Sequence, residues 1–311
     1  MKTLSIVIIF LTSLSFYGQT SQKEIFTEIE GDTLWGTFTN VQNEVDTSQT
    51  LVLIIAGSGP TDRDGNNNVM KNYSLQMLGN DLAKFGFPSI RYDKRGIAQS
   101  INAFITEADL RFQQNVIDAA SFYDYAISIG YKKVAIAGHS EGSLVGLLLA
   151  NDKDAYKYIS LAGAGRPISE VLKEQYENTA PIIRDSAHVV IDILASGKKI
   201  DTLSPWLYSI FRPQLQDYII SWMAIDPVKE LAKYKNNSLI IQGTTDIQVA
   251  VKDAELLHAA SDSSELVVID GMNHIFKKAP ADRILNKKTY NQPELPLHPD
   301  LIISIVNFLK K

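Results

Sequence analysis

The chain has 311 residues, of which 45% are hydrophobic and 21% charged, and it contains no cysteine. This length fits one large α/β domain with room for an insertion. Thirty lysines and arginines stand against 35 acidic residues, and the net charge of −5 offers no basic face to a phosphate backbone. We therefore expect no nucleic-acid binding. The lack of cysteine excludes disulfides and thiolate nucleophiles, so covalent catalysis would use oxygen or nitrogen.

Residues 1–20 have the pattern of a secretory signal peptide. Lys2 gives a short positive region, and Leu4 to Phe16 form an uncharged apolar stretch that is shorter than the roughly 20 residues needed to cross a membrane. We expect export to the periplasm or the medium, a mature domain of residues 21–311, and no stable membrane insertion after cleavage. An uncleaved N-terminal anchor is the alternative, because cleavage after Gly18 would put Phe16 where a small residue is preferred.

Beyond this leader, the hydrophobic pattern alternates between strands and helices. Polar and apolar residues alternate around Gly31-Asp32, which predicts a β-hairpin with strands Glu24–Glu30 and Thr33–Thr39. Continuous apolar runs then predict strands buried on both faces, separated by stretches of helical spacing. The expected strands are Leu51–Ala56, Ser89–Tyr92, Lys133–Ala137, Tyr158–Leu161, Ser238–Ile241 and Glu265–Ile269, and the expected helices are Tyr73–Phe85, Thr106–Ile129, Gly142–Asn151, Val251–Ala260 and Pro299–Leu309. This order predicts a mostly parallel, doubly wound α/β sheet that opens with antiparallel strands.

One interval, from about 166 to 237, interrupts this alternation. Its apolar residues recur at three- and four-residue steps, and it contains no buried strand pattern. We interpret it as a helical lid over the carboxyl edge of the sheet, with two ordinary crossover helices and long loops as the alternative. A lid would supply an apolar acyl pocket. Its large apolar side chains are the candidates to line that pocket: Trp206, Tyr208, Phe211, Trp222 and Met223.

Ser140 is the candidate nucleophile. It stands in Gly138-His139-Ser140-Glu141-Gly142, between an expected strand and an expected helix. A serine between two glycines at such a turn is held in a strained conformation that projects its hydroxyl above the sheet. The glycines leave room where a Cβ would clash.

A serine hydroxyl requires a base to accept its proton. His274 follows the last expected strand, so its loop lies at the same carboxyl edge as Ser140. A late histidine also fits the chain order nucleophile, acid, base that is typical of this type of sheet. We predict that His274 is the base, with His298 as the alternative.

The base requires a carboxylate that fixes its tautomer and stabilises the imidazolium. Asp246 follows the expected strand Ser238–Ile241 on another carboxyl-edge loop, and it is the predicted acid. Asp270, at the end of the next strand, and Asp226, before Pro227, are the alternatives.

The oxyanion formed during acyl transfer requires hydrogen-bond donors that are already in place. One is the backbone N–H of Glu141, the residue after the nucleophile. The second is expected in the loop Gly57-Ser58-Gly59-Pro60, where we choose Ser58 because Pro60 has no N–H and the two glycines let the backbone approach closely.

The acidic segment that follows this loop does not fit a calcium loop. Asn67 and Tyr73 stand where such a loop requires glycine and glutamate. We expect hydrogen bonds of Asp62, Arg63 and Asp64 to pin the segment instead. The sequence shows no metal-ligand cluster, and the predicted mechanism needs no cofactor.

Six motifs together resemble the EstD-type carboxylesterases of the α/β-hydrolase superfamily, which are close to the serine aminopeptidase-like hydrolases. The motifs are Gly57-Ser58-Gly59-Pro60-Thr61-Asp62-Arg63-Asp64-Gly65, Arg91-Tyr92-Asp93-Lys94-Arg95-Gly96, Gly138-His139-Ser140-Glu141-Gly142, Asp226-Pro227, Gln242-Gly243-Thr244-Thr245-Asp246-Ile247-Gln248-Val249 and Met272-Asn273-His274. The resemblance runs from about Leu51 to the C-terminus. It implies an α/β-hydrolase fold with a helical cap, a Ser-Asp-His triad and hydrolysis of small-molecule esters with short acyl chains.

Three functions are compatible with these residues: a secreted carboxylesterase that forms an acyl-enzyme, a small aminopeptidase or amidase on the same triad, and a non-catalytic binding protein. A non-catalytic binding protein on this scaffold should have lost at least one of Ser140, Asp246 and His274. Because all three are present, this function is disfavoured. An aminopeptidase would need a carboxylate to hold the substrate ammonium, and the lid offers Glu170, Glu174, Glu177, Asp185 and Asp192. We expect these acids to be solvated and therefore favour the esterase.

Overall fold

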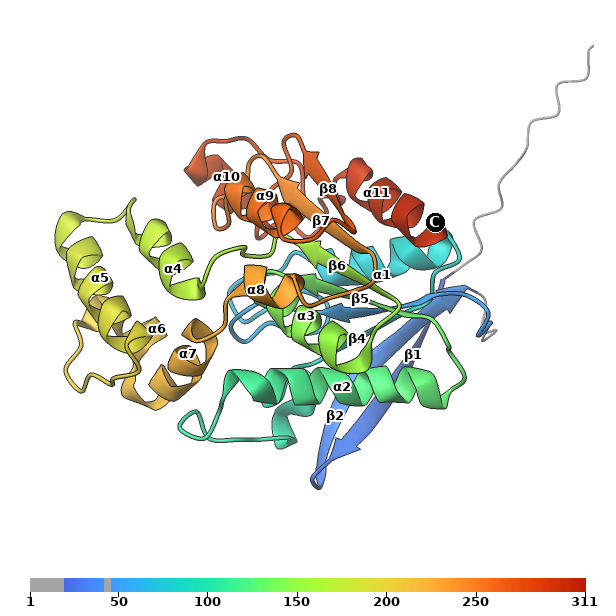
Figure 1. The fold of residues 1–311 in the computed structure, drawn as a ribbon, viewed down its shortest axis with the longest axis horizontal. Helices are drawn as coiled ribbons and strands as arrows, with labels where there is room; N and C mark the ends of the chain where they lie inside the picture. The colour runs from blue at the N-terminus through green and yellow to red at the C-terminus, as the bar shows by residue number, and fades with distance from the viewer. Residues whose placement is uncertain (1–19, 42–45) are drawn as a thin grey trace, which may run out of the picture.

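The computed structural model describes residues 20–41 and 46–311, so the predicted signal peptide, apart from Thr20, lies outside the described residues. The strands are β1 (Thr20–Ile29), β2 (Asp32–Val41), β3 (Leu51–Ile55), β4 (Ser89–Tyr92), β5 (Val134–His139), β6 (Lys157–Leu161), β7 (Ser238–Gly243) and β8 (Ser264–Ile269). They form one sheet in the order β1-β2-β4-β3-β5-β6-β7-β8 (Figure 1). β2 pairs antiparallel with β1 and β4, and all other neighbours are parallel. The predicted sheet, with its antiparallel opening hairpin, is confirmed.

The helices that cross between these strands are α1 (Ser74–Lys84), α2 (Phe112–Ser128), α3 (Glu141–Lys153) and α9 (Val251–Ala259), and α11 (Pro299–Lys310) follows the last strand. Each matches a predicted helix, but α2 begins later than its predicted start at Thr106. Thr106 instead closes a turn, in which its carbonyl accepts from the N–H of Leu110 and its hydroxyl from that of Asp109. Two further elements, η1 (Ala98–Asn102) and α10 (Arg283–Thr289), were not predicted.

Helices cover both faces of the sheet, which explains the continuous apolar runs of the strands. In β3, Leu51, Leu53 and Ile55 belong to the core under α2, α3 and α9. The alternate residues Val52 and Ile54 belong to the core under α1 and α11. Successive side chains of a strand point to opposite faces, so both sets have to be apolar. The loops that leave the carboxyl ends of the parallel strands then gather at one edge.

The segment between β6 and β7 contains helices and no strand. Its elements are α4 (Ile168–Tyr176), α5 (Pro181–Ala195), η2 (Pro205–Leu207), α6 (Tyr208–Phe211), η3 (Pro213–Leu215), α7 (Gln216–Met223) and α8 (Pro227–Leu231). Four of them begin with proline, whose fixed φ suits the first helical position and whose missing N–H is not needed there. Figure 1 shows α4 to α7 as a group beside the sheet, which we call the lid.

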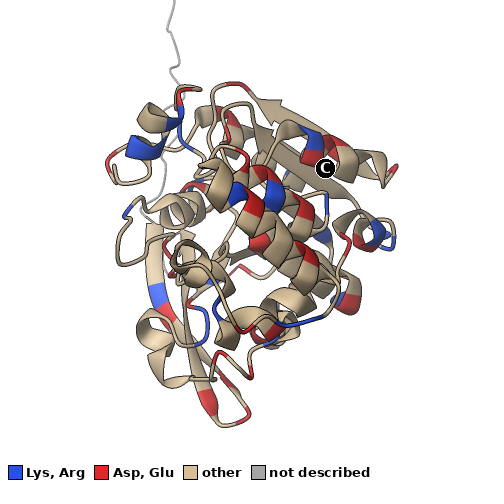
Figure 2. Ribbon diagram, turned by 90° about the vertical axis from the view of Figure 1, so that its left-hand side faces the viewer, with Lys and Arg blue, Asp and Glu red and all other residues tan. Residues whose placement is uncertain are grey.

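The outer surface of the lid carries charges of both signs, interspersed rather than gathered into one patch (Figure 2). Several of them pair, as Arg184 does with Asp185 at 2.8 Å and Lys173 with Asp192. None of the helices in the described part of the chain is long and apolar enough to cross a membrane.

Candidate active site

Ser140 lies at the turn between β5 and α3 with φ 55° and ψ −120°. This backbone conformation costs on the order of 1–3 kcal/mol and persists only where the surroundings fix it. A Cβ on Gly138 would lie 2.0 Å from the carbonyl oxygen of Gly142, and a Cβ on Gly142 would lie 2.5 Å from those of Ile55 and Ala56. Both glycines are therefore required for the tight turn that presents the serine.

His274 and Asp246 meet on adjacent loops at the carboxyl ends of β8 and β7. The Nδ1 of His274 donates to Oδ2 of Asp246 at 2.7 Å, and the two side chains are only 4% and 1% exposed. With Nδ1 protonated, Nε2 of the neutral ring is free to accept a proton. His274 and Ser140 line the same polar cavity of about 100 Å³.

Asp246 is held by four hydrogen bonds. Its Oδ1 accepts from the N–H groups of Gln248 at 2.7 Å and Val249 at 3.0 Å, and its Oδ2 accepts from Gln242 at 2.9 Å in addition to His274. Burial alone would raise the pKa of Asp246, but His274 and these hydrogen bonds outweigh burial and lower it below its ordinary value. Gln242 could have been found in the sequence, because it is a polar residue at the end of an otherwise apolar strand.

His139 precedes the predicted nucleophile, and no role was predicted for it from the sequence. Its ring lies 4.8 Å from the ring of His274, and its Nε2 donates to the backbone carbonyl of His274 at 2.9 Å. Burial, reinforced by the neighbouring His274, lowers the pKa of His139 to about 3. His139 is therefore a neutral side chain that fixes the backbone of the predicted base.

The helix α10 forms hydrogen bonds with the loop that carries Asp246 and with the loop that carries His274. Asn286 donates to the carbonyl of Thr245, next to Asp246, at 2.8 Å and to that of Pro280 at 2.9 Å. Asn273, next to His274, donates to the hydroxyl of Thr289 at 2.8 Å. Contacts between these polar side chains thus fix the two loops relative to each other.

The alternative acids and base have local structural roles. His298 precedes α11 and accepts from the N–H of Asp300 at 3.3 Å. Asp226 accepts from the first N–H groups of α8, and the exposed Asp270 accepts from Thr244 at 2.9 Å. None of these three predicted alternatives lines a described cavity with Ser140.

The two expected oxyanion donors lie next to Ser140. Ser58 lines both cavities that contain Ser140. Glu141 is the residue after Ser140 and occupies the first position of α3. Within residues 20–41 and 46–311, the N–H groups of Ser58 and Glu141 have no hydrogen-bond acceptor. Two unpaired donors beside the predicted nucleophile are available to a substrate oxygen.

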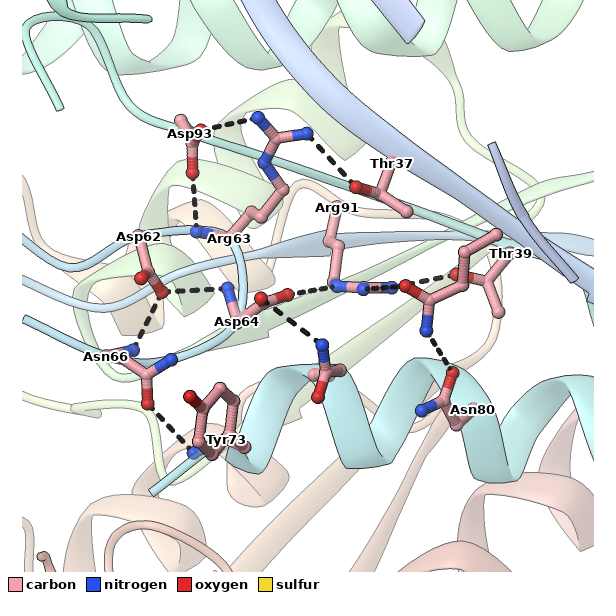
Figure 3. A network of polar contacts seen from close by, with 12 residues as sticks. Thr37, Thr39, Asp62, Arg63, Asp64, Asn66, Tyr73, Asn80, Arg91 and Asp93 are labelled. Atoms are coloured by element: carbon pink, nitrogen blue, oxygen red, sulfur yellow. Dashed lines mark hydrogen bonds and ion pairs between the residues drawn. The ribbon is translucent and has the colours of Figure 1, made fainter. Parts of the chain in front are cut away.

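The loop behind Ser58 is pinned as predicted (Figure 3). Asp62 accepts from the backbone N–H groups two and four residues later, at 2.9 and 2.8 Å. Arg63 forms a buried ion pair with Asp93 at 2.6 Å, and Asp64 accepts from Arg91 at 2.9 Å. The acids of this segment therefore bind arginines and backbone N–H groups.

A second cavity, of about 590 Å³, extends from Ser140 under the lid. It is lined mostly by apolar side chains, including Ile168 and Leu172 of α4 and Ile219 of α7. Of the five side chains predicted for the acyl pocket, only Trp222 lines it.

The other four predictions were wrong. Phe211 and Met223 are buried in the hydrophobic core that the lid shares with the sheet, and Trp206 and Tyr208 are 71% and 49% exposed. Helical spacing identifies an apolar stripe, but the packing of the helices against one another decides which part of the stripe faces a cavity.

The acidic residues expected in the lid do not reach either cavity. Glu174 binds Arg166 at 2.6 Å and Lys252 at 2.8 Å, and Glu170 is exposed. The others pair with neighbouring basic residues of the lid: Glu177, Asp185 and Asp192. Among the described residues, Glu141 is the one acid that lines the larger cavity.

A parallel sheet of this order, with a serine at a glycine turn after β5 and a carboxylate and a histidine after β7 and β8, defines an α/β hydrolase. The chain matches the family model described as "Serine aminopeptidase, S33" over residues 65–278, and it belongs to this family.

Comparisons with known proteins agree with the predicted resemblance. Esterase EstD of Thermotoga maritima is 22% identical over 231 residues, which are 72% of this chain and 54% of that protein. The chain thus spans about half the length of that curated relative.

Two solved structures show the same fold. Est1E from Butyrivibrio proteoclasticus, solved with ferulic acid bound, gives a TM-score of 0.61 at 17% identity, with 90% of this chain and 99% of that chain covered. Proline iminopeptidase from Mycobacterium smegmatis gives 0.58 at 11% identity, with 93% and 98% covered. The α/β-hydrolase fold predicted from the sequence is confirmed.

Proposed function

We propose that the protein is an exported serine carboxylesterase that uses Ser140, His274 and Asp246. The observation that carries this proposal is the position of Ser140 between two cavities, one polar and lined by His274, the other apolar and under the lid. Export rests on the signal-like pattern of residues 1–20 alone.

In the proposed reaction, Nε2 of His274 takes the proton of the Ser140 hydroxyl as Oγ attacks the ester carbonyl carbon. The carbonyl oxygen becomes an oxyanion that accepts from the N–H groups of Ser58 and Glu141. The carbon–oxygen bond to the alcohol then breaks, and His274 returns the proton to the leaving oxygen. Water hydrolyses the acyl-enzyme by the same steps, while Asp246 stabilises the imidazolium each time.

The proton transfer also indicates which cavity binds the alcohol part of the ester and which binds the acyl part. The leaving alcohol has to reach Nε2 of His274, so it occupies the cavity of about 100 Å³ that His274 lines. The acyl group then occupies the cavity of about 590 Å³, which His274 does not line. This arrangement favours a small alcohol and an acyl group larger than acetyl.

The charges around the larger cavity favour an ester over an aminoacyl substrate. An aminopeptidase would need an acidic side chain to bind the substrate ammonium, and the five lid acids are paired outside the cavity or, for Glu170, exposed. Burial raises the pKa of Glu141 and so disfavours its charged form, and Lys94 and Tyr218 already interact with its carboxyl group. A substrate cation would therefore gain little at this carboxylate.

A substrate panel tests the proposal. We expect hydrolysis of p-nitrophenyl esters, with kcat/KM rising beyond the acetyl ester as the acyl group fills the apolar cavity, and little hydrolysis of aminoacyl-p-nitroanilides. Steady-state kinetics on both series, with Ser140→Ala as the blank, provides the measurement. Faster turnover of the anilides than of every ester would identify a peptidase instead.

Trp222→Ala should shift the preferred acyl length upward by about one or two carbons, because removing the indole enlarges an apolar pocket in which one methylene contributes about 1–3 kcal/mol. Trp222 lines the larger cavity and stacks on Phe112, with 5.7 Å between the ring centroids. The matched control is Trp206→Ala, since Trp206 is 71% exposed and lines neither cavity. The prediction fails if both variants keep the wild-type profile in kcat/KM across the ester panel.

The pH profile of kcat/KM should contain no ionisation of His139 above roughly pH 4. His139 faces His274, Asp246 and Lys94, and its pKa of about 3 keeps it neutral above roughly pH 4. Because His139 adds no ionisation above roughly pH 4, any rise of log(kcat/KM) between about pH 4 and 8 should have a slope no greater than one. A slope approaching two would contradict this, because it would require His139 to ionise in the same range.

A further inference from the structure

Lys94 contacts the loop that carries the second expected oxyanion donor. It follows β4 in the segment 91–96, a motif to which the mechanism above gives no role. Its Nζ donates to the carbonyl oxygen of Gly57 at 2.5 Å and also to that of Gly59. Lys94 thus binds the carbonyl groups of both neighbours of Ser58.

The contact with Gly57 determines where the N–H of Ser58 points. The carbonyl group of Gly57 and the N–H group of Ser58 belong to one planar peptide, and no peptide bond in the described residues is cis. In a trans peptide the C=O and the N–H point in opposite directions. A Gly57 carbonyl directed at Lys94 therefore directs the Ser58 N–H away from Lys94, which lines neither cavity, whereas Ser58 lines both cavities that contain Ser140.

Glycines flank Ser58 on both sides, and the first packs closely, since a Cβ on Gly57 would lie 3.1 Å from that of Ser140 and 3.2 Å from Nδ1 of His139. Glycine rotates freely about its backbone bonds, Gly59 has φ 72°, and nothing lies within 4 Å of the place where its Cβ would be. Thr61 binds the far side of the loop, since its N–H donates to Gly59 at 2.9 Å and its hydroxyl to Ser58 at 3.1 Å. In the part of the chain that the structure describes, Lys94 is the only donor to the Gly57 carbonyl.

We propose that Lys94 is a positioning residue that holds the Gly57–Ser58 peptide in the orientation in which the Ser58 N–H binds the oxyanion. The inference rests on the proposed ester hydrolysis. Because the oxyanion forms only as the serine attacks, losing this donor should lower kcat and leave KM nearly unchanged. A role confined to folding would instead lower the melting temperature and leave kcat of the folded fraction intact.

Lys94→Met keeps the aliphatic stem and removes the donor. We expect kcat for esters to fall by about 10²- to 10³-fold, the usual effect of losing one oxyanion donor, with KM within about threefold of wild type. Inhibition by a trifluoromethyl ketone, whose adduct with Ser140 carries an oxyanion, should weaken by a similar factor. The matched control is Lys157→Met, since Lys157 is a buried lysine that likewise donates to a carbonyl, that of Phe308 at 2.8 Å, away from the site.

The neighbouring carboxylate of Glu141 needs its own control, because Lys94→Met also leaves that charge without its partner. Glu141→Gln removes the charge and keeps the Glu141 N–H. The fall in kcat caused by Lys94→Met should therefore persist when both variants share the Glu141→Gln background. If Glu141→Gln restores kcat to the Lys94→Met enzyme, the loss came from the unpaired carboxylate and the proposal is wrong.

Chemical rescue gives a second readout. The chain has no cysteine, so Lys94→Cys introduces a single thiol. Alkylation with 2-bromoethylamine rebuilds a side chain of nearly the length of lysine with an ammonium group, and it should recover at least about tenfold in kcat, whereas iodoacetamide should not.

If Lys94→Met retains kcat within about threefold of wild type while Ser140→Ala is inactive, the role of Lys94 is refuted and the esterase stands. A wild-type enzyme without ester turnover would refute the proposed function itself.

Discussion

Replacing Ser140 by alanine should lower kcat for ester hydrolysis by about 10⁴- to 10⁶-fold without unfolding the protein. Alanine removes the only atom of the side chain that attacks the substrate. The Cβ at position 140 remains, and so do Gly138 and Gly142, which permit the turn. His274→Ala should cost a similar factor, because the hydroxyl then has no base to accept its proton.

The double variant Ser140→Ala/His274→Ala should be hardly slower than either single variant, since nucleophile and base act as one unit. His298→Ala is the matched histidine control. His298 caps α11, so its replacement should lower the melting temperature and leave kcat unchanged. Near-normal kcat in His274→Ala, together with inactive His298→Ala, would reverse the assignment of the base.

Asp246→Asn should lower kcat by about 10⁴-fold while the fold is retained. The carboxylate accepts four hydrogen bonds, two from backbone N–H groups at Oδ1 and one each from Gln242 and His274 at Oδ2. An asparagine whose oxygen keeps the two backbone bonds turns its NH₂ group toward His274. The imidazole then accepts at Nδ1 and carries its proton on Nε2, where it can no longer take the serine proton.

The same substitution at a neighbouring acid separates tautomer control from a loss of charge. Asp270→Asn removes an exposed carboxylate on the next loop that contacts Thr244, so kcat should stay within about twofold of wild type. Equal losses in Asp246→Asn and Asp270→Asn would contradict the assignment. Steady-state kinetics on one ester and a melting curve for each variant make the comparison.

The sheet could be predicted because its signal is local. β3 is apolar at every position since helices cover both faces, and such a run needs no knowledge of its partners. The helix α10 could not be predicted, because its buried residues Asn286 and Thr289 are polar whereas Ile284 is exposed. Hydrophobic periodicity has nothing to detect in such a helix.

In the active site, too, some residues could be predicted from a local sequence pattern and others could not. Ser140, Asp246 and His274 could be proposed because each follows an expected strand, and parallel strands bring their carboxyl ends to one edge. Their supporting residues depend on contacts between distant segments. His139 reaches a carbonyl 135 residues away, and Lys94 reaches one 37 residues away. Nothing in the local pattern of either residue indicates its partner.

The exposed helix α10 has a consequence for how the protein tolerates heat. It buries only two of its seven residues, yet one of them, Asn286, fixes the loop of Asp246, and the other, Thr289, fixes the loop of His274. Elements with few buried contacts open at a lower free-energy cost than the sheet. Opening of this one helix would release the loops of Asp246 and His274 from each other while the eight strands remain paired. Loss of activity on warming would then be an early and reversible event, distinct from global unfolding.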